Sequence, residues 1–388
     1  MSATAPTPLD SGRPNGAAGA VAAAGYLLLG VAGCPVLHSW SPALFHRALA
    51  AVQRPGSYLR LRAESATEAL DLARALGLAG LNLTAPFKES ILPWLDRLDD
   101  GARAVGAVNT VIFTGSRTVG YNTDVIGVRR MLAQACGALR GARVAVLGAG
   151  GAARAVGYVL AQQGCGEVLL VNRDPARGAR AARALGLGFV PWERAGAALA
   201  GADLVIACLA PGAEVPPAWL AAVPQILSAS YHGPSLPPAA GPADARQAAA
   251  TWLVGQAVAG FTLMAGIEAP DVAFEAGLAD VRGRPWPGPG ALVLVGPPAV
   301  GRALTGLVPM PVLAVQAGDL ADDDLDQAGL VVLCVEPRAP VPSPVQHLLR
   351  RSGRSVDLVL HADRAPDLLA RTLAAEIAAL GTLPGPPG

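Results

Sequence analysis

The sequence contains very little lysine and little charge of either sign. Lys88 is its only lysine among 30 Lys and Arg residues, and charged residues make up 15% of the 388 positions. The formal net charge is +1, and no Lys/Arg-rich run stands out. Nucleic-acid and membrane-surface proteins usually carry concentrated positive charge. We therefore expect neither a nucleic acid nor a membrane as partner.

Long hydrophobic runs and paired cysteines are also missing. No uninterrupted apolar stretch reaches the roughly 20 residues that span a bilayer, and the N-terminus lacks the pattern of a signal peptide. We interpret residues 1–25, which are rich in Ala, Gly, Pro and Ser, as a disordered tail. The five cysteines are scattered, without a CxxC or Cys/His spacing for zinc. These absences predict a cytoplasmic protein with reduced thiols and no metal site.

Short apolar strands alternate with helices along most of the chain, which predicts an α/β fold. Residues 88–106 read as one helix, and AVNTVIFT with TVGYN reads as a strand pair. The predicted units are a first α/β domain at 26–124 with a returning helix at 251–275, a dinucleotide-binding domain of the Rossmann type at 125–250, a Pro/Gly-rich linker at 280–290, and a small α/β domain of unknown role at 291–388.

A glycine-rich turn follows the strand ARVAVLG and opens a helix. GAGGAA, residues 148–153, fits the pattern G-x-G-x-x-A in the context that this motif requires. Gly148 makes the tight turn, and Gly150 lets a pyrophosphate approach the backbone. Gly151 and Ala152 begin the helix whose N–H groups and dipole attract the phosphates. The turn therefore predicts a bound dinucleotide.

The next strand ends in residues that bear on the choice of cofactor. It ends at Asn172-Arg173-Asp174, and Arg177 follows. Two arginines favour NADP, because a guanidinium can clamp a 2′-phosphate with charge-assisted hydrogen bonds. Asp174 would instead repel that phosphate or bind a ribose hydroxyl. We expect NADP, with NAD still possible, and the alternative that both arginines are solvated loop charges stays open.

The first half of the chain gathers polar residues where helices and strands end. Each could cap a helix or form a turn, but together they indicate one polyhydroxylated ligand. Lys88 and Asp124 are the reactive pair, because a lysine can protonate the alkoxide that forms when a ketone is reduced, and a carboxylate can orient that lysine. The members of the set are Ser39, Ser41, Asn82, Thr84, Lys88, Asn109, Thr110, Asn122 and Asp124.

Seven motifs in this order and spacing resemble the shikimate dehydrogenase family over about residues 26–274. They are HSWSP, NLTAPFK, GAVNT, YNTD, GAGGAARA, NRDPAR and LVGQAVAGF. The resemblance implies reversible NADP-linked reduction of 3-dehydroshikimate to shikimate in a cleft between a substrate domain and a Rossmann domain. It implies that Ser39 and Ser41 hold the substrate carboxylate with Tyr231 nearby, that Thr84, Asn109 and Gln256 bind ring hydroxyls, and that Lys88 and Asp124 are catalytic.

The sequence departs from the family pattern on the nicotinamide side. The run at residues 207–213 lacks the usual polar residues and methionine, Ser228 stands where an acid is usual, and Trp252 stands where methionine is usual. These changes keep two alternatives open: a quinate or aminoshikimate dehydrogenase, and a non-catalytic binding or regulatory paralogue. A small-molecule substrate is the expected partner, and the chain is expected to be a monomer or a homodimer.

The last hundred residues resemble a degenerate shikimate kinase only faintly. Gly296 and Gly301 have the separation of a phosphate-binding loop, but Arg302 and Ala303 replace its lysine and hydroxyl. We therefore expect no kinase activity from this segment. A structural role is expected, with regulation or oligomerisation as the functional alternative.

Overall fold

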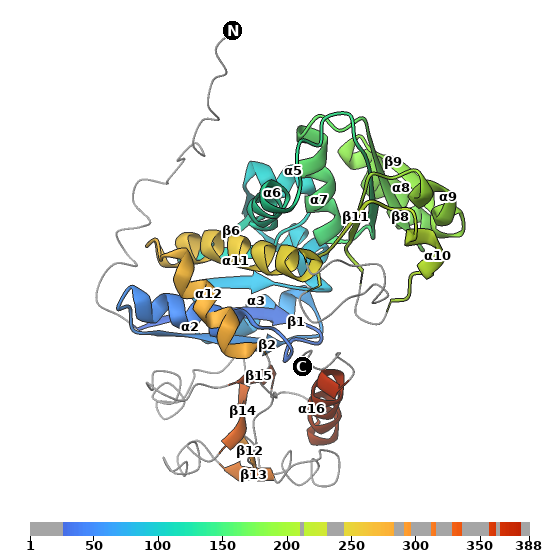
Figure 1. The fold of residues 1–388 in the computed structure, drawn as a ribbon. Helices are drawn as coiled ribbons and strands as arrows, with labels where there is room; N and C mark the ends of the chain where they lie inside the picture. Colours follow the sequence, from blue (N-terminus) through green and yellow to red (C-terminus); the bar gives the residue numbers. More distant parts are fainter. Residues whose placement is uncertain are drawn as a thin grey trace.

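A computed structural model describes most of the chain: residues 26–209, 213–230, 244–282, 291–295, 312–315, 328–335, 357–361 and 365–381. These residues form two sheets with helices packed on them (Figure 1). The predicted tail, Tyr231, most of the linker and the phosphate-loop-like stretch lie outside the described residues. The α/β fold with a Rossmann-type second sheet is confirmed.

The first part of the chain supplies the larger sheet from its middle strand β2 to its edge strand β4. Its elements are β1 (Leu27–Gly33), α2 (Ser41–Ala51), β2 (Gly56–Arg62), α3 (Ala66–Ala75), β3 (Gly80–Leu83), α4 (Phe87–Ser90), η1 (Leu92–Trp94), β4 (Arg97–Leu98), α5 (Asp100–Val105), β5 (Thr110–Thr114) and β6 (Arg117–Tyr121). Strands β2, β1 and β3 run parallel, so their carboxyl ends meet at one edge. The predicted strand pair is confirmed as the antiparallel β5–β6.

The predicted helix at 88–106 is wrong. The structure breaks it into α4, η1, the short strand β4 and α5. Pro93 sits in the first turn of η1, where it lacks the N–H that a continuous helix would need. Asp99 then starts α5 by accepting hydrogen bonds from the backbone of Gly101 and Ala102. A proline and a capping acid thus divide a stretch whose apolar pattern alone favours one helix.

The second sheet is parallel throughout, in the order β11-β10-β7-β8-β9. Its elements are α6 (Asp124–Ala135), β7 (Arg143–Leu147), α7 (Gly151–Gln162), β8 (Glu167–Asn172), α8 (Pro175–Leu185), β9 (Gly188–Pro191), η2 (Trp192–Arg194), α9 (Ala195–Ala200), β10 (Leu204–Ala207), α10 (Pro217–Leu220) and β11 (Gln225–Ser228). The glycine turn joins the central strand β7 to α7, as the sequence predicts.

Two helices return the chain from the second sheet to the first, where one was predicted. They are α11 (Asp244–Ala265) and α12 (Asp271–Val281), and Figure 1 shows them lying over the first sheet. Helix α11 crosses α6 so closely that a Cβ on Gly127 would lie 2.5 Å from the Trp252 ring, and one on Gly255 would lie 3.0 Å from the Gly127 Cα. This crossing fixes α11 against the start of α6.

Helix α11 is long and apolar enough to cross a membrane by length and composition, over Gln247–Ala265. In the fold, however, 72% of that window is buried. Its residues Leu253, Ala257 and Phe261 belong to the core cluster that also contains Leu44 and Phe45 of α2. The apolar character of α11 is therefore that of a helix buried in a protein core.

The C-terminal segment extends the first sheet. Its described elements are β12 (Ala291–Val295), β13 (Val312–Val315), β14 (Ala328–Val335), β15 (Leu358–His361) and α16 (Pro366–Gly381). The order β13-β12-β14-β15 continues directly into β2, with Val359 opposite Leu61. The described part of this segment has four strands and one helix, and the strands share a sheet with the first domain (Figure 1).

Candidate active site

Lys88 and Asp124 form a close ion pair between the two sheets. Lys88 Nζ lies 2.6 Å from Asp124 Oδ2. The lysine comes from α4, just after β3, and the aspartate is the first residue of α6. The Lys88 side chain is 19% exposed and that of Asp124 only 4%. The structure therefore brings the two predicted catalytic residues together, with the ammonium as the more accessible partner.

Asp124 is held by two further features. The indole Nε1 of Trp252 donates to Asp124 Oδ1 at 3.2 Å, from α11. A carboxylate at the start of a helix is also stabilised by the positive end of the helix dipole. Each carboxylate oxygen thus has its own donor, Lys88 on one side and Trp252 on the other. The sequence marked Trp252 only as a departure, and its contact with Asp124 is new.

Asn109 and Gln256 join the same site through hydrogen bonds. Asn109 is 1% exposed; its Nδ2 donates to Gln256 Oε1 at 3.0 Å, and its Oδ1 accepts from the Thr123 backbone N at 2.7 Å. Thr123 immediately precedes Asp124, so the position of this amide fixes the backbone that presents the carboxylate. Two residues predicted to bind ring hydroxyls are therefore in contact, close to the Lys88–Asp124 ion pair.

Thr84, Ser39 and Ser41 lie at the carboxyl-terminal edge of the first sheet. The loops after β1 and β3 are paired by hydrogen bonds from Thr84 N to Ala32 O, 2.9 Å, and from Cys34 N to Ala85 O, 3.1 Å. The Thr84 methyl group packs where a Cβ on Gly33 would lie, so that glycine makes room for it. Both serines are buried. Lys88, which follows β3, lies at this same edge of the sheet.

The two serines contribute little to capping helix α2. The residue that caps α2 is Trp40, and no side chain makes a cap hydrogen bond there. Ser39 Oγ accepts only a long bond, 3.4 Å, from Ser41 N. No hydrogen bond joins either serine to Lys88, Asp124 or Asn109 among the described contacts. Both remain candidate ligands, as the sequence predicts.

Asn82 and Asn122, both in the polar set, have structural partners instead. Asn82 accepts from Tyr58 Oη at 2.7 Å and donates to Thr110 Oγ1 at 2.9 Å. Asn122 Nδ2 donates to Ala107 O at 2.8 Å. Buried amides need such partners to offset their desolvation. Asn82 therefore ties β3 to β2 and β5, and Asn122 ties the turn after β6 to the segment after α5.

The glycine turn presents bare backbone beside Lys88. Gly148 has φ +116°, and a Cβ there would lie 2.6 Å from Cys208 O, so only glycine suits the position. No side chain caps α7, which leaves its first N–H groups without a side-chain acceptor. A Cβ on Gly151 would lie 3.0 Å from both Cβ and Cδ of Lys88. The turn therefore packs directly on the stem of the lysine.

Asp174 is engaged with its own helix. Its Oδ1 accepts from Arg177 N at 2.9 Å, which makes it the N-cap of α8. Asn172 Nδ2 donates to Asp174 O at 2.9 Å and so stiffens the same turn. The sequence left open whether Asp174 would oppose a phosphate. The cap contact gives this carboxylate a structural role.

The two arginines of the nucleotide side differ. Arg177 Nη2 lies 2.5 Å from Glu89 Oε1, an ion pair that links α8 to α4 and passes within 3.4 Å of where a Cβ on Gly150 would stand. Arg173 is exposed, and no hydrogen bond or ion pair from it is found within the described part of the chain. Glu89, the residue after Lys88, was not predicted from the sequence. Arg173 is thus the more available of the two for a phosphate.

Other reactive groups near the site are not set up for chemistry. Burial, assisted by Asp124, raises the pKa of the Cys208 thiol well above its ordinary value, so this thiol stays protonated. Across the described residues, no group of three or more His, Cys, Asp or Glu side chains could hold a metal. The lysine, carboxylate and amides therefore remain the candidate groups for the chemistry.

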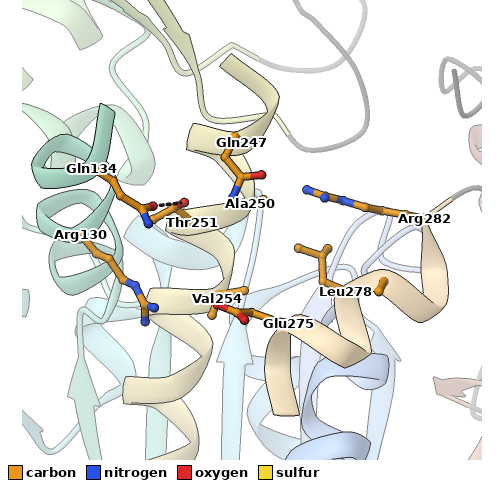
Figure 2. Close-up of a pocket in the computed structure, with 10 residues that line it drawn as sticks. Arg130, Gln134, Gln247, Ala250, Thr251, Val254, Glu275, Leu278 and Arg282 are labelled. Carbon is orange, nitrogen blue, oxygen red and sulfur yellow. Dashed lines mark hydrogen bonds between the residues drawn. The ribbon is translucent and has the colours of Figure 1, made fainter. Parts of the chain in front are cut away.

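A separate pocket of about 250 Å³ opens away from these residues. Figure 2 shows it between α6, α11 and α12, with Arg130, Gln247, Glu275 and Arg282 around it and the Gln134–Thr251 hydrogen bond at its side. None of the predicted catalytic, substrate or cofactor residues lines it. The pocket has no part in the chemistry proposed below.

Two family models match the chain. Residues 31–111 match the shikimate dehydrogenase substrate binding domain, and residues 130–215 match shikimate / quinate 5-dehydrogenase. These ranges contain all the predicted site residues except Asp124, Tyr231 and Gln256.

Curated relatives and solved structures agree with these matches. The shikimate dehydrogenase (NADP(+)) of Moorella thermoacetica is 36% identical over 287 residues, which cover 68% of this chain and 96% of the relative. That of Halothermothrix orenii is 39% identical over 156 residues, 39% of this chain, and the match spans about half, 54%, of the relative. A Thermus thermophilus shikimate 5-dehydrogenase in complex with NADP(H) and shikimate has 30% identity and a TM-score of 0.56, covering 66% of this chain and 99% of its own.

Proposed function

Because this chain belongs to the shikimate dehydrogenase family, we propose that it catalyses the reversible NADP-dependent reduction of 3-dehydroshikimate to shikimate, a step of aromatic amino acid (chorismate) biosynthesis. One observation carries the proposal. Lys88 Nζ lies 2.6 Å from Asp124 Oδ2 while the stem of the same lysine packs on Gly151 of the glycine turn. The proton donor is therefore next to the place where a nicotinamide cofactor would be held.

The glycine turn fits a bound NADP. Gly148 and Gly150 leave the backbone uncovered, and the N-terminus of α7 offers N–H groups without a side-chain cap. Gly151 and Ala152 begin that helix, and Asn172 stiffens the next turn. Arg173 would hold the 2′-phosphate, and Arg177 would do so only by releasing Glu89. When bound, NADPH supplies the hydride.

Lys88 would donate the proton that completes the reduction. As the carbonyl carbon gains a hydride, its oxygen takes on alkoxide character, and the Lys88 ammonium stabilises that oxygen and then protonates it. In the reverse direction the neutral amine accepts the hydroxyl proton. Asp124 keeps the ammonium aimed through its Oδ2, and Trp252 keeps Asp124 aimed through its Oδ1.

Arginine could not replace this lysine. A guanidinium stays protonated throughout the physiological range and cannot hand a proton back and forth. Of the 30 Lys and Arg residues, all are arginine except Lys88. The one place where lysine stands is thus the one place where the proposed chemistry requires a group that can lose its proton.

The remaining polar residues would hold the substrate. Ser39 and Ser41 would bind its carboxylate, and Thr84, Asn109 and Gln256 would bind its ring hydroxyls. Support comes from the hydrogen bond between Asn109 and Gln256 beside the ion pair, and from the pairing of the loops that carry Thr84 and the serines. Tyr231 remains a prediction near the carboxylate. The enzyme is expected to act in the cytoplasm as a monomer or homodimer.

The test is turnover of shikimate by the purified chain. When shikimate and NADP⁺ are added, the absorbance of the reduced nicotinamide should increase with time. The rate of this increase should be lower with quinate or an aminoshikimate. A faster rate with quinate or aminoshikimate would move the assignment to that dehydrogenase. If none of these substrates is oxidised with NADP⁺ or NAD⁺, the enzyme proposal fails, and a non-catalytic paralogue becomes the better description.

Because Lys88 is the only lysine, amine chemistry gives an independent test of its position. An amine-reactive reagent should modify one side chain besides the N-terminal amine, and modification of Lys88 should abolish turnover. Shikimate together with NADP⁺ should slow that modification if both bind around the lysine. Equal labelling rates with and without the ligands would contradict the proposed site.

A further inference from the structure

Glu376 of α16 contacts the loop that carries Ser39, although the two are far apart in the sequence. Its Oε2 accepts hydrogen bonds from the backbone N–H groups of Val36 and Leu37, each at 2.9 Å. Its Oε1 lies 2.6 Å from Arg62 Nε, at the end of β2. The Glu376 side chain is only 1% exposed. One buried carboxylate from the C-terminal segment thus holds two consecutive amides of the loop between β1 and α2.

A second link from the same segment reaches the loop. Arg60 of β2 donates to the Ser39 carbonyl oxygen from Nε at 3.0 Å and from Nη2 at 2.7 Å. Its Nη1 is 3.5 Å from the backbone oxygen of Asp357, just before β15. Arg60 is 7% exposed. The carbonyl of a predicted substrate residue is therefore tied to β2 and, more weakly, to the C-terminal segment.

Apolar packing supports these contacts. Val36 and Leu37 are fully buried, and they share one core cluster with Leu369, Leu373 and Ile377 of α16. Figure 1 shows α16 on the side of the first sheet where the C-terminal strands continue it. Burial raises the pKa of Glu376, and the two amides and Arg62 act in the opposite direction. A carboxylate is buried at such a cost only where several donors surround it.

The C-terminal segment lies outside the family match. The two family models end at residues 111 and 215. Glu376 is also the acid in the middle of the apolar run LAAEIAAL. The carboxylate therefore acts on a loop of the first matched domain from a part of the chain beyond both family models.

We propose that Glu376 is a positioning residue for the substrate carboxylate, and that the C-terminal segment serves as a clamp that fixes the loop presenting Ser39 and Ser41. The proposal rests on the proposed function, because that function assigns the serines to the carboxylate. In this proposal the C-terminal segment contributes no catalytic group. Loss of the clamp should weaken substrate binding and leave the chemical step intact.

The deciding variants are Glu376→Ala and Glu376→Gln. The alanine removes both amide bonds and the partner of Arg62, so the KM for shikimate should rise about tenfold or more, with kcat and the KM for NADP⁺ changed less than about threefold. The glutamine keeps an oxygen that can accept from the same amides and should recover much of the loss. Asp367→Ala, an exposed acid on the same helix, is the matched control and should change nothing.

An ester of the substrate separates positioning from general damage. Shikimate methyl ester lacks the carboxylate charge, so the Glu376→Ala variant should lose much less affinity for the ester than for shikimate. A variant that is only less stable would lower the active fraction for both substrates equally. A soluble, folded Glu376→Ala enzyme with an unchanged KM for shikimate would overturn the proposal.

Hydrogen exchange tests the clamp without turnover. In the full-length protein the Val36 and Leu37 amides should exchange slowly. Their exchange rate should rise in both variants, and it should rise less in Glu376→Gln than in Glu376→Ala. If Glu376→Ala does not fold, slow exchange in the unmodified chain with partial loss in Glu376→Gln still supports the clamp. Rapid exchange of both amides in the unmodified chain overturns it. If the unmodified chain oxidises no substrate, the proposed function fails while the exchange result still decides whether the clamp exists.

Discussion

The substrate side and the nucleotide side of the candidate site are built from different groups. On the substrate side, Lys88, Asp124 and Asn109 are buried or nearly so, and each has specific side-chain partners. On the nucleotide side, the turn at Gly148 offers backbone, and the exposed Arg173 offers charge. The function of the substrate side depends on particular side-chain groups, and that of the nucleotide side on uncovered backbone and charge. Changes on the first should therefore affect the chemical step, and changes on the second the affinity for the cofactor.

The largest effect is expected at Lys88. Lys88→Ala should lower kcat by about a thousandfold or more, because it removes the proton donor and leaves Asp124 buried without its ammonium. Lys88→Arg keeps the charge but should be nearly as inactive, since a guanidinium does not release its proton. The measurement is steady-state shikimate oxidation, with circular dichroism as the check on folding. Near-normal kcat in the arginine variant would show that only the charge matters.

Acid should act first on the substrate side. Burial, and then the nearby charge of Arg60, lower the pKa values of His38 and His46 from 6.5 to about 4. Because the unfolded chain takes up these protons at a higher pH than the folded chain does, stability should fall as the pH drops from about 6.5 to about 4. Each histidine would contribute up to about 3 kcal/mol of this loss.

The measurement is the unfolding midpoint across that pH range. His46 Nε2 accepts from Tyr58 N at 3.0 Å, and glutamine could accept the same bond without titrating. His46→Gln should therefore reduce the dependence of the unfolding midpoint on pH. In acid, hydrogen exchange should become fast in the first sheet before it becomes fast in the second. An unchanged slope in this variant would rule out His46 as a source of the acid sensitivity.

Local chemistry was predictable from the sequence and long-range pairing was not. The motifs around Lys88, Asp124 and Gly148 carry their own structural context, namely a strand followed by a turn and a helix, so their roles could be inferred from short segments. The pairing of Lys88 with Asp124 was predicted, and the ion pair confirms it. Substrate roles for Ser39, Ser41, Thr84, Asn109 and Gln256 stay predictions.

The unpredicted contacts join residues far apart in the chain. Trp252 is 128 positions from Asp124, Arg177 is 88 from Glu89, and Glu376 is 340 from Val36. Such pairs depend on how helices pack on sheets, which no local pattern specifies. Signals did exist: a lone acid within an apolar helix at position 376, and a tryptophan where the family usually has methionine. Each marks a buried polar group that must find a partner.

On the nucleotide side, Arg173→Ala should raise the KM for NADP⁺ by about tenfold to thirtyfold and leave the KM for NAD⁺ and kcat nearly unchanged. The reason is that an exposed arginine can pair with the 2′-phosphate, which NAD⁺ lacks. Arg180→Ala, at another arginine of α8, is the control. Equal effects on the two cofactors would argue that Arg173 does not select between them.

Glu89 sharpens this test, because it holds Arg177 by the 2.5 Å ion pair. Glu89→Gln should free Arg177 and lower the KM for NADP⁺ a few-fold. If the KM for NADP⁺ rises instead, the link between α4 and α8 contributes more to the cofactor site than Arg177 would on its own.

A loss of kcat smaller than that at Lys88 is expected at Trp252, which contacts Asp124 from α11. Trp252→Phe keeps most of the buried ring but removes the N–H that holds Asp124 Oδ1 at 3.2 Å. Loss of one hydrogen bond to a carboxylate that keeps its lysine should lower kcat by about threefold to tenfold, with little change in either KM. In Asp124→Asn the same Trp252→Phe change should cost less, because the carboxylate it holds is already gone. Equal costs in the two backgrounds would mean that Trp252 acts through the packing of α6 on α11 at Gly127, and not through its hydrogen bond to Asp124.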